Sequence, residues 1–285
     1  MSLILTKKLP AFDRVEENTT ATLDMPIGYT YHAVALEISN LTPSEISRIT
    51  IYANGEAIAV YKGGDDLNRI AQFDGRADAT SDNVLMLDFR RFGLLTRQAQ
   101  ELTIIGTGRP RGDGGEARDG QPTDPRPITT LQMEVEIGAT ASGNKPKIDA
   151  RAEVTPPQPS GLLRKVQRFV YNPDSSGEFE IADLPRLGMV SRMIFDTANA
   201  SIDRVRIERD QIVTFDRSEA MNERVQGDGI RVPQGNLWVV DFTENGYGSD
   251  SMTVKNVQDW RTTLWMAGSG TVPVYVEYLA PVSNF

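Results

Sequence analysis

The second half of this chain of 285 residues repeats the first half in the same order. The four matched pairs of segments are Ser47–Tyr52 with Asp203–Glu208, Leu85–Phe89 with Trp238–Phe242, Leu102–Gly106 with Leu264–Gly268, and Met133–Ile137 with Val274–Tyr278. The spacing between partners is nearly constant over the first three pairs and shortens at the fourth, which predicts one extra loop in the first half, over residues 107–127. The duplication predicts two tandem copies of one β-rich domain, an organisation typical of a building block rather than of a catalyst.

Short segments rich in β-branched and aromatic residues alternate with Gly, Pro and Asn, as in β-sandwiches. The Asn54-Gly55 pair between two such segments predicts a tight hairpin, because a type I′ turn requires positive φ at both central residues. The further predicted strands are Tyr31–Ser39, Val84–Phe89, Leu102–Ile105, Leu131–Ile137, Val166–Tyr171, Met189–Phe195, Arg204–Glu208, Asn236–Phe242, Thr262–Met266 and Val272–Leu279. We therefore predict an all-β fold of two sandwich domains.

Helices are predicted to be few and short. Thr42 and Pro43 suit the cap and the first position of a single helical turn over Pro43–Ser47. Two further helical segments are predicted over Asp65–Phe73 and Gly93–Glu101. Strands therefore carry the fold.

Residues 151–161 contain three prolines and predict a stiff connector between the two domains. The first domain then covers residues 1–150 and the second covers residues 162–285. Loop 107–127 in the first domain is polar and rich in Gly and Pro, which predicts an exposed loop.

The composition is that of an ordinary globular protein, with 39% hydrophobic residues and a mean hydropathy of −0.34. No segment reaches the ~18 apolar residues that a membrane-spanning helix requires, so no membrane insertion is expected. The net charge of −9 is shared evenly between the halves, and no basic tail is present to neutralise phosphates, which argues against direct nucleic-acid binding. The absence of cysteine excludes disulfides and cysteine-based metal sites.

No catalytic residue is predicted. His32 is the only histidine, and it alternates with apolar residues in a predicted strand, which favours a packed side chain over a catalytic or metal-binding one. Asp88 and Asp241 each precede a Phe at the end of a matched strand. A catalytic pair of carboxylates needs two different environments, so one copy per repeat favours a structural role at the same strand end.

Four acidic residues in one stretch are candidates for a calcium site, because carboxylate oxygens suit this hard cation. They are Asp65, Asp66, Asp74 and Asp78. Their spacing does not follow the calcium-binding loop pattern with a glutamate at the twelfth position, so a solvated acidic segment is the favoured interpretation. Calcium is therefore the only candidate cofactor.

Several short motifs give the chain a recognisable pattern from near the N-terminus to the last residue. They are Pro26–Tyr31, Leu41–Ile46, Glu180–Arg186, Tyr275–Tyr278 and Asn284–Phe285. With these motifs the chain resembles the major capsid proteins of corticoviruses, tailless icosahedral bacteriophages with an internal membrane. Glu180–Arg186 is the most specific match, whereas the loop over residues 106–127 departs from the family pattern.

The resemblance implies a double jelly roll, in which two eight-stranded sandwiches stand side by side. It implies that three chains form a capsomer with six quasi-equivalent corners, which tiles an icosahedral shell over an internal membrane. The expected partners are the chain itself as a homotrimer, neighbouring trimers, and penton and minor membrane-associated capsid proteins. The expected location is the virion, after synthesis in the cytoplasm of a bacterial host. Capsids of this family are associated with calcium, which adds weight to the acidic segment.

Two alternatives remain open. The first is a carbohydrate-binding tandem β-sandwich, or a phage fibre that binds a receptor, which would need an exposed aromatic platform. Trp238 and Trp265 lie in predicted strands, which favours core positions instead. The second is a hydrolase, which the single histidine and the symmetric carboxylates disfavour. A basic cluster, Arg164, Lys165 and Arg168, is expected on the exposed side of a strand.

Overall fold

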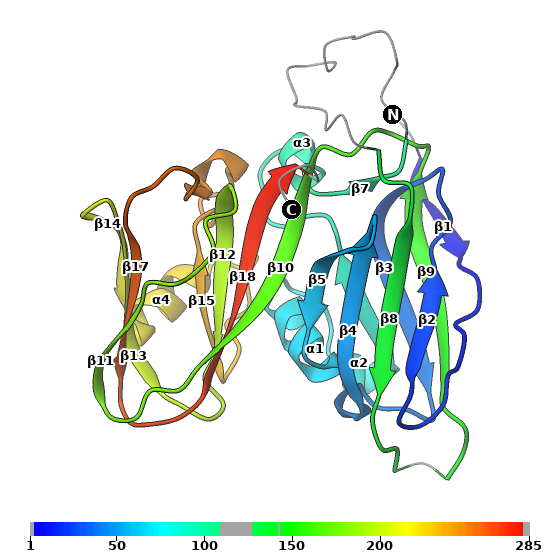
Figure 1. Ribbon diagram of the computed structural model, residues 1–285, viewed down its shortest axis with the longest axis horizontal. Coiled ribbons are helices and arrows are strands. Elements are labelled where there is room, and N and C mark those ends of the chain that lie inside the picture. Colours follow the sequence, from blue (N-terminus) through cyan, green and yellow to red (C-terminus); the bar gives the residue numbers. More distant parts are fainter. Residues whose placement is uncertain (1–2, 109–126, 142, 282–285) are drawn as a thin grey trace, which may run out of the picture.

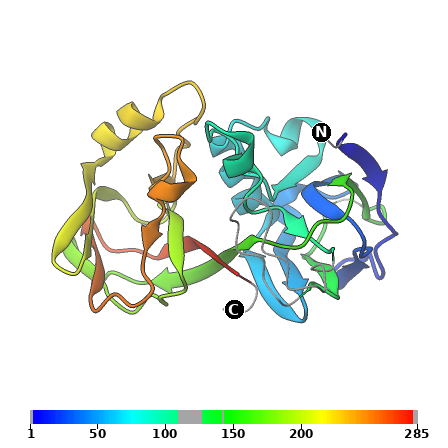
Figure 2. The same cartoon turned by 90° about the horizontal axis from the view of Figure 1, so that it is seen from above.

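The computed structural model describes residues 3–108, 127–141 and 143–281, and these form two β-sandwiches side by side (Figures 1 and 2). The first sandwich has one sheet of β1 (Leu5–Lys8), β9 (Lys147–Thr155), β3 (Thr30–Ser39) and β6 (Val84–Asp88), and another of β2 (Thr20–Asp24), β8 (Leu131–Ile137), β4 (Ile46–Ala53) and β5 (Glu56–Tyr61). The second has one sheet of β10 (Leu162–Tyr171), β18 (Val272–Pro281), β12 (Met189–Asp196) and β15 (Leu237–Asp241), and another of β11 (Gly177–Ile181), β17 (Trp260–Met266), β13 (Ile202–Arg209) and β14 (Ile212–Ser218).

The two domains have the same strand order. The short strands β7 (Ile105–Gly106) and β16 (Met252–Thr253) are additions to the edge of a sheet. Counted without them, each domain has one sheet with its first, eighth, third and sixth strands, and another with its second, seventh, fourth and fifth strands. This is the strand order of a jelly roll. The predicted double jelly roll of two tandem eight-stranded sandwiches is confirmed.

Helices fill the connections between strands. They are η1 (Pro43–Glu45), α1 (Gly64–Phe73), α2 (Ala79–Asp82), α3 (Arg97–Gln100), α4 (Glu219–Gln226) and η2 (Gly248–Asp250). The predicted turn at Pro43 forms as η1, where the backbone N–H of Thr42 donates to the Glu45 carboxylate at 2.7 Å. None of the described helices is long and apolar enough to cross a bilayer.

The predicted hairpin joins β4 to β5. Asn54 and Gly55 have φ angles of 52° and 82°, the positive values that a type I′ turn requires.

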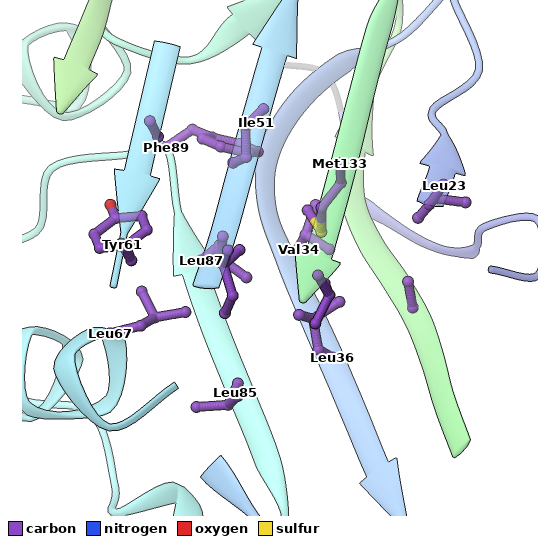
Figure 3. Close-up of a cluster of buried hydrophobic side chains, with 14 of the residues drawn as sticks. Leu23, Val34, Leu36, Ile51, Tyr61, Leu67, Leu85, Leu87, Phe89 and Met133 are labelled. Carbon is purple, nitrogen blue, oxygen red and sulfur yellow. The ribbon is translucent and has the colours of Figure 1, made fainter. Parts of the chain in front are cut away.

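Between the sheets of the first domain, apolar side chains from β3, β4, β6 and β8 interdigitate (Figure 3). Val34, Ile51 and Met133 are among these buried residues. The alternation of buried and half-exposed residues along β8 is the period-2 pattern from which its strand was predicted.

The last two matched pairs of the repeat are wrong. Strand β8 is equivalent to β17, and β9 is equivalent to β18, because these strands hold the same places in their sheets. Leu102 and Thr103 lie in a turn and Ile104 lies in no strand, so only Ile105 of this predicted strand is in β7; the Thr103 hydroxyl donates to the Phe89 carbonyl at 2.6 Å. The first domain is therefore longer over the whole connection between β6 and β8, residues 89–130. The equivalent connection of the second domain, residues 242–259, is shorter. Of loop 107–127, residues 109–126 lie outside the described residues.

The predicted connector begins too early. Strand β9 continues through Thr155 and pairs with both β1 and β3, so residues 151–155 belong to the first domain and the connector covers residues 156–161. Within residues 151–161 the first proline is Pro156, and the alternation of exposed and buried residues before it is that of a strand.

Candidate functional site: the interface between the domains

One sheet of the second domain lies with its outer face against the first domain. At its edge, β10 pairs in parallel with β5, with Val166 opposite Ala59, and this joins two sheets into one of nine strands (Figure 1). Ile194, Val239 and Tyr275 project from the second domain into the hydrophobic cluster of the first. The two sandwiches therefore share a packed interface in addition to their connector.

A buried carboxylate lies at the centre of this interface. Glu277 on β18 has 1% of its side chain exposed, and Arg192 donates to it at 2.7 Å. Arg91 and Arg164 each approach it to 3.7 Å. Burial alone would raise the pKa of Glu277, but these three guanidinium groups lower the pKa to about 2. Glu277 is consequently ionised at neutral pH.

Arg192 joins the two domains. Its side chain is fully buried on β12, where it contacts Glu277 of its own domain and Asp74 of the first domain, the latter at 2.7 Å. Burial opposes the charge of Arg192, whereas Asp74 and Glu277 raise its pKa. Each of these buried charges depends on the others, since an unpaired charge is costly to bury.

A second buried pair crosses the interface at Asp241. Arg91 from the first domain donates to one carboxylate oxygen at 2.6 Å, and Arg231 from the second donates to the other at 2.9 Å. Burial works against ionisation of Asp241, yet Arg91 and Arg231 hold its pKa below its usual range. The backbone N–H of Val232 also donates to the carbonyl of Phe73 across the interface, at 3.0 Å, a typical hydrogen-bond length.

Helix α1 supplies a third set of contacts. Arg69 donates to both carboxylate oxygens of Asp196, at 3.2 and 3.0 Å, and also to Asp66 at 2.5 Å. The Tyr275 hydroxyl donates to Asp66 and accepts from the backbone N–H of Lys62 at 3.0 Å. Burial and the Asp66 charge raise the pKa of Tyr275. Charged groups of both domains thus neutralise one another along the interface.

The four calcium candidates have other contacts. Asp66 and Asp74 pair with arginines of the interface. Asp78 accepts from Asn68 and caps α2, while Asp65 is exposed in the first turn of α1. Within the part of the chain that the structure describes, no three His, Cys, Asp or Glu side chains are grouped closely enough to hold a metal ion. Calcium binding at these residues stays a prediction.

Asp88 and Asp241 end the equivalent strands β6 and β15, as the repeat predicted. Arg76 donates to both oxygens of Asp88, at 2.9 and 2.7 Å, just as Arg231 pairs with Asp241. Each carboxylate therefore holds an arginine from the connection that precedes its strand, in keeping with the predicted structural role. His32 is buried, with its Nε2 at 3.0 Å from the Thr155 hydroxyl, and burial lowers its pKa.

Two expectations about surface residues are wrong. Arg164 and Lys165 lie largely buried on β10, where Arg164 donates to the Asp88 carbonyl across the interface and approaches the Glu277 carboxylate of its own domain. Trp265 is half-buried on the outer face of β17 instead of in the core, and the guanidinium of Arg204 lies 4.5 Å from its ring centre. Trp238 is buried as predicted.

The role of Glu277 was missed from the sequence, although a signal was present. It is the single acid in the apolar strand Val272–Leu279, within the Tyr275–Tyr278 motif. A lone carboxylate in a strand buried on both faces needs a cationic partner.

Both domains match family models. Residues 6–155 match the viral coat protein P2 N-terminal domain, and residues 163–282 match the viral coat protein P2 C-terminal domain. The chain belongs to the viral coat protein P2 family. Among curated relatives of this coat protein family, the major capsid protein P2 of Pseudoalteromonas phage PM2 is 23% identical over 277 residues, which is 95% of each chain. The predicted resemblance to corticovirus capsid proteins is confirmed.

Solved structures of viral capsid proteins have the same fold as this coat protein. The crystal structure of major capsid protein P2 from bacteriophage PM2 matches with a TM-score of 0.83 at 22% identity, over 99% of this chain and 100% of that one. The structure of Sulfolobus Turreted Icosahedral Virus matches with a TM-score of 0.66 at 11% identity, over 99% and 91%. The PBCV-1 virus capsid matches at 0.64 and 8% identity, over 98% and 94%.

Proposed function

We propose that this protein is a viral major capsid protein whose activity is assembly. Three chains form a trimer, and trimers tile an icosahedral shell over an internal membrane. The observation that carries the proposal is the buried, charge-paired interface that fixes two equivalent jelly rolls in one arrangement. A chain with a loose connector would not present a defined surface to a lattice, whereas this interface makes one rigid unit of two similar domains.

The duplication supplies the geometry that a shell needs. Two similar domains in each of three chains place six similar corners around one axis, so that a trimer has a nearly hexagonal outline. Hexagonal units can surround one another on all sides. A contact between different surfaces of neighbouring chains closes into a ring when its rotation divides a full turn evenly.

The proposed partners are neighbouring trimers, penton proteins and minor membrane-associated capsid proteins. The proposed location is the virion, reached after synthesis in the bacterial cytoplasm. We propose a structural role without enzymatic activity, since the carboxylates described at the interface are occupied by arginines. Glu277 and Asp241, for example, are 1% and 2% exposed and offer no free acid or base to a substrate.

Native mass measurement tests this proposal. We expect the purified chain of 31.5 kDa to give a species of three times that mass over a wide range of concentrations. A strictly monomeric species over the same range would contradict the proposed function.

A further inference from the structure

Each domain has two sheet edges that correspond to the two edges joined within the chain. Strand β10, the first strand of the second domain, pairs with β5, the fifth strand of the first domain. Their equivalents are β1, the first strand of the first domain, and β14, the fifth strand of the second. Among the described strands, β1 pairs only with β9, and β14 pairs only with β13, so each has one free edge. An unpaired edge offers backbone donors and acceptors to another strand.

The register of the sheets sets which residues are equivalent at these edges. Ile51 pairs with Ala59 beside a one-residue register shift in β5, and Ile207 pairs with Phe215 beside the same shift in β14. Phe215 is therefore the counterpart of Ala59.

The first strands align in the same way. Glu277 pairs with Val166, and Glu153 pairs with Thr6. The third strands β12 and β3 each have a register shift at the corresponding position, directly before the residue that pairs with this glutamate. Thr6 is therefore the counterpart of Val166, and the contact of Ala59 with Val166 has Phe215 and Thr6 as its unused equivalents.

Apolar residues are exposed on these unused surfaces. Ile212 and Val213 on β14 are 62% and 42% exposed, and Leu5 on β1 is 53% exposed. Apolar side chains exposed beside an unpaired strand edge are typical of an interaction site.

Helix α4, the counterpart of α1, is inverted in its polarity. Asn222 and Gln226 point inward and each donates to the carbonyl of Val239 at 2.8 Å, while Met221 and Val225 are 54% and 40% exposed. An ordinary surface helix buries its apolar residues and exposes its polar ones. The reversed pattern is expected where a second protein surface covers the helix.

We propose that β1 of one chain pairs in parallel with β14 of the next chain, with Thr6 opposite Phe215, and that α4 of the second chain packs on the outer face of β3 and β9 of the first. The occupant is a second copy of this chain, because the chain itself contains the matching contact between β5 and β10. This inference rests on the proposed trimer and names the surfaces that form it.

The equivalence also identifies an ion pair between chains. Aligned at their N-caps Gly63 and Ser218, α1 and α4 place Arg224 at the position of Arg69. The alignment of β12 with β3 places Glu37 at the position of Asp196. The ion pair of Arg69 with Asp196 within the chain thus has a counterpart between chains, in which Arg224 of one chain pairs with Glu37 of its neighbour.

The same alignment gives Met221 a neighbour. It lies at the position of Asp66, which contacts Tyr275 of the other domain. The counterpart of Tyr275 on β9 is Arg151, which is half exposed. Met221 of one chain is therefore expected to lie beside Arg151 of the next.

Charge reversal tests the proposed contact. R224E and E37R should each raise the protein concentration at which half of the trimers dissociate by about tenfold or more, because like charges then face each other across the contact. The double variant R224E/E37R should restore trimers. R261E is the control, since Arg261 on β17 is a partly exposed arginine that pairs with Asp259 and is separated from β14 by β13, outside the proposed contact, and it should leave the trimer unchanged. Circular dichroism reports whether each variant is folded.

A second pair of variants keeps the test decisive if a reversal prevents folding. M221K places a cation beside Arg151 and should weaken the trimer, whereas M221E at the same site should not. If the wild-type chain is trimeric and R224E, E37R and M221K all dissociate as the wild type does, the proposed contact is wrong while the proposed function stands. If the wild-type chain is monomeric, the proposed function itself fails.

Discussion

The two domains use one sheet of the same topology in opposite ways. In the second domain, the outer face of the sheet around β18 and β12 is buried against the first domain, with Glu277 and Arg192 almost inaccessible to solvent. In the first domain, the equivalent face around β9 and β3 has half-exposed ion pairs such as Arg151 with Glu37. The comparison shows that the strand order of a sheet does not determine whether its outer face is buried. The same face can hold the chain together or remain open to a neighbouring chain.

The largest expected effect comes from breaking the buried face. Arg192→Met should lower the free energy of unfolding by about 3–5 kcal/mol, because the buried Glu277 and the partly buried Asp74 would lose their shared cation. Arg151→Met is the matched control on the open face, where the loss of an exposed pair with Glu37 should cost about 0–1 kcal/mol. Chemical denaturation of both variants measures the difference. Equal losses would show that the two faces do not differ as described.

A smaller effect is expected from acid. The pKa of Glu277 is about 2 in the folded protein and about 4.3 in an unfolded chain, so its contribution is complete above the unfolded value and is lost as the pH falls toward 2. Glu277→Gln should therefore flatten the loss of stability between about pH 5 and pH 2. Glu153→Gln, at the equivalent and more exposed position, should leave most of that pH dependence in place. The same slope in the wild type and in Glu277→Gln would contradict the assignment.

Local signals predicted much of the fold. The hairpin at Asn54-Gly55 and the alternating strand β8 depend on backbone and side-chain preferences of neighbouring residues, and both were predicted. The later part of the repeat was misaligned because Leu102–Gly106 has the composition of a strand, while its neighbours hold most of it in turns. Composition reports local preference, whereas sheet position is set by partners far away in the chain.

The charged interface was beyond the reach of the sequence for the same reason. Arg164 has the pattern of a solvent-facing residue, since arginine is rarely buried unless it is paired. Its partner Glu277 lies more than a hundred positions further along the chain, and only the fold brings the two together. Asp88 and Asp241 were predictable because the duplication itself marked them as equivalent.

The central claim is that two equivalent jelly rolls, fixed to each other by buried charges, form six similar corners in a trimer. Electron microscopy of the purified particle, viewed along its symmetry axis, tests this most directly. We expect three chains with six lobes in a nearly hexagonal outline, with first and second domains alternating around the ring. Particles of two lobes, or a ring in which the domains do not alternate, would contradict the account.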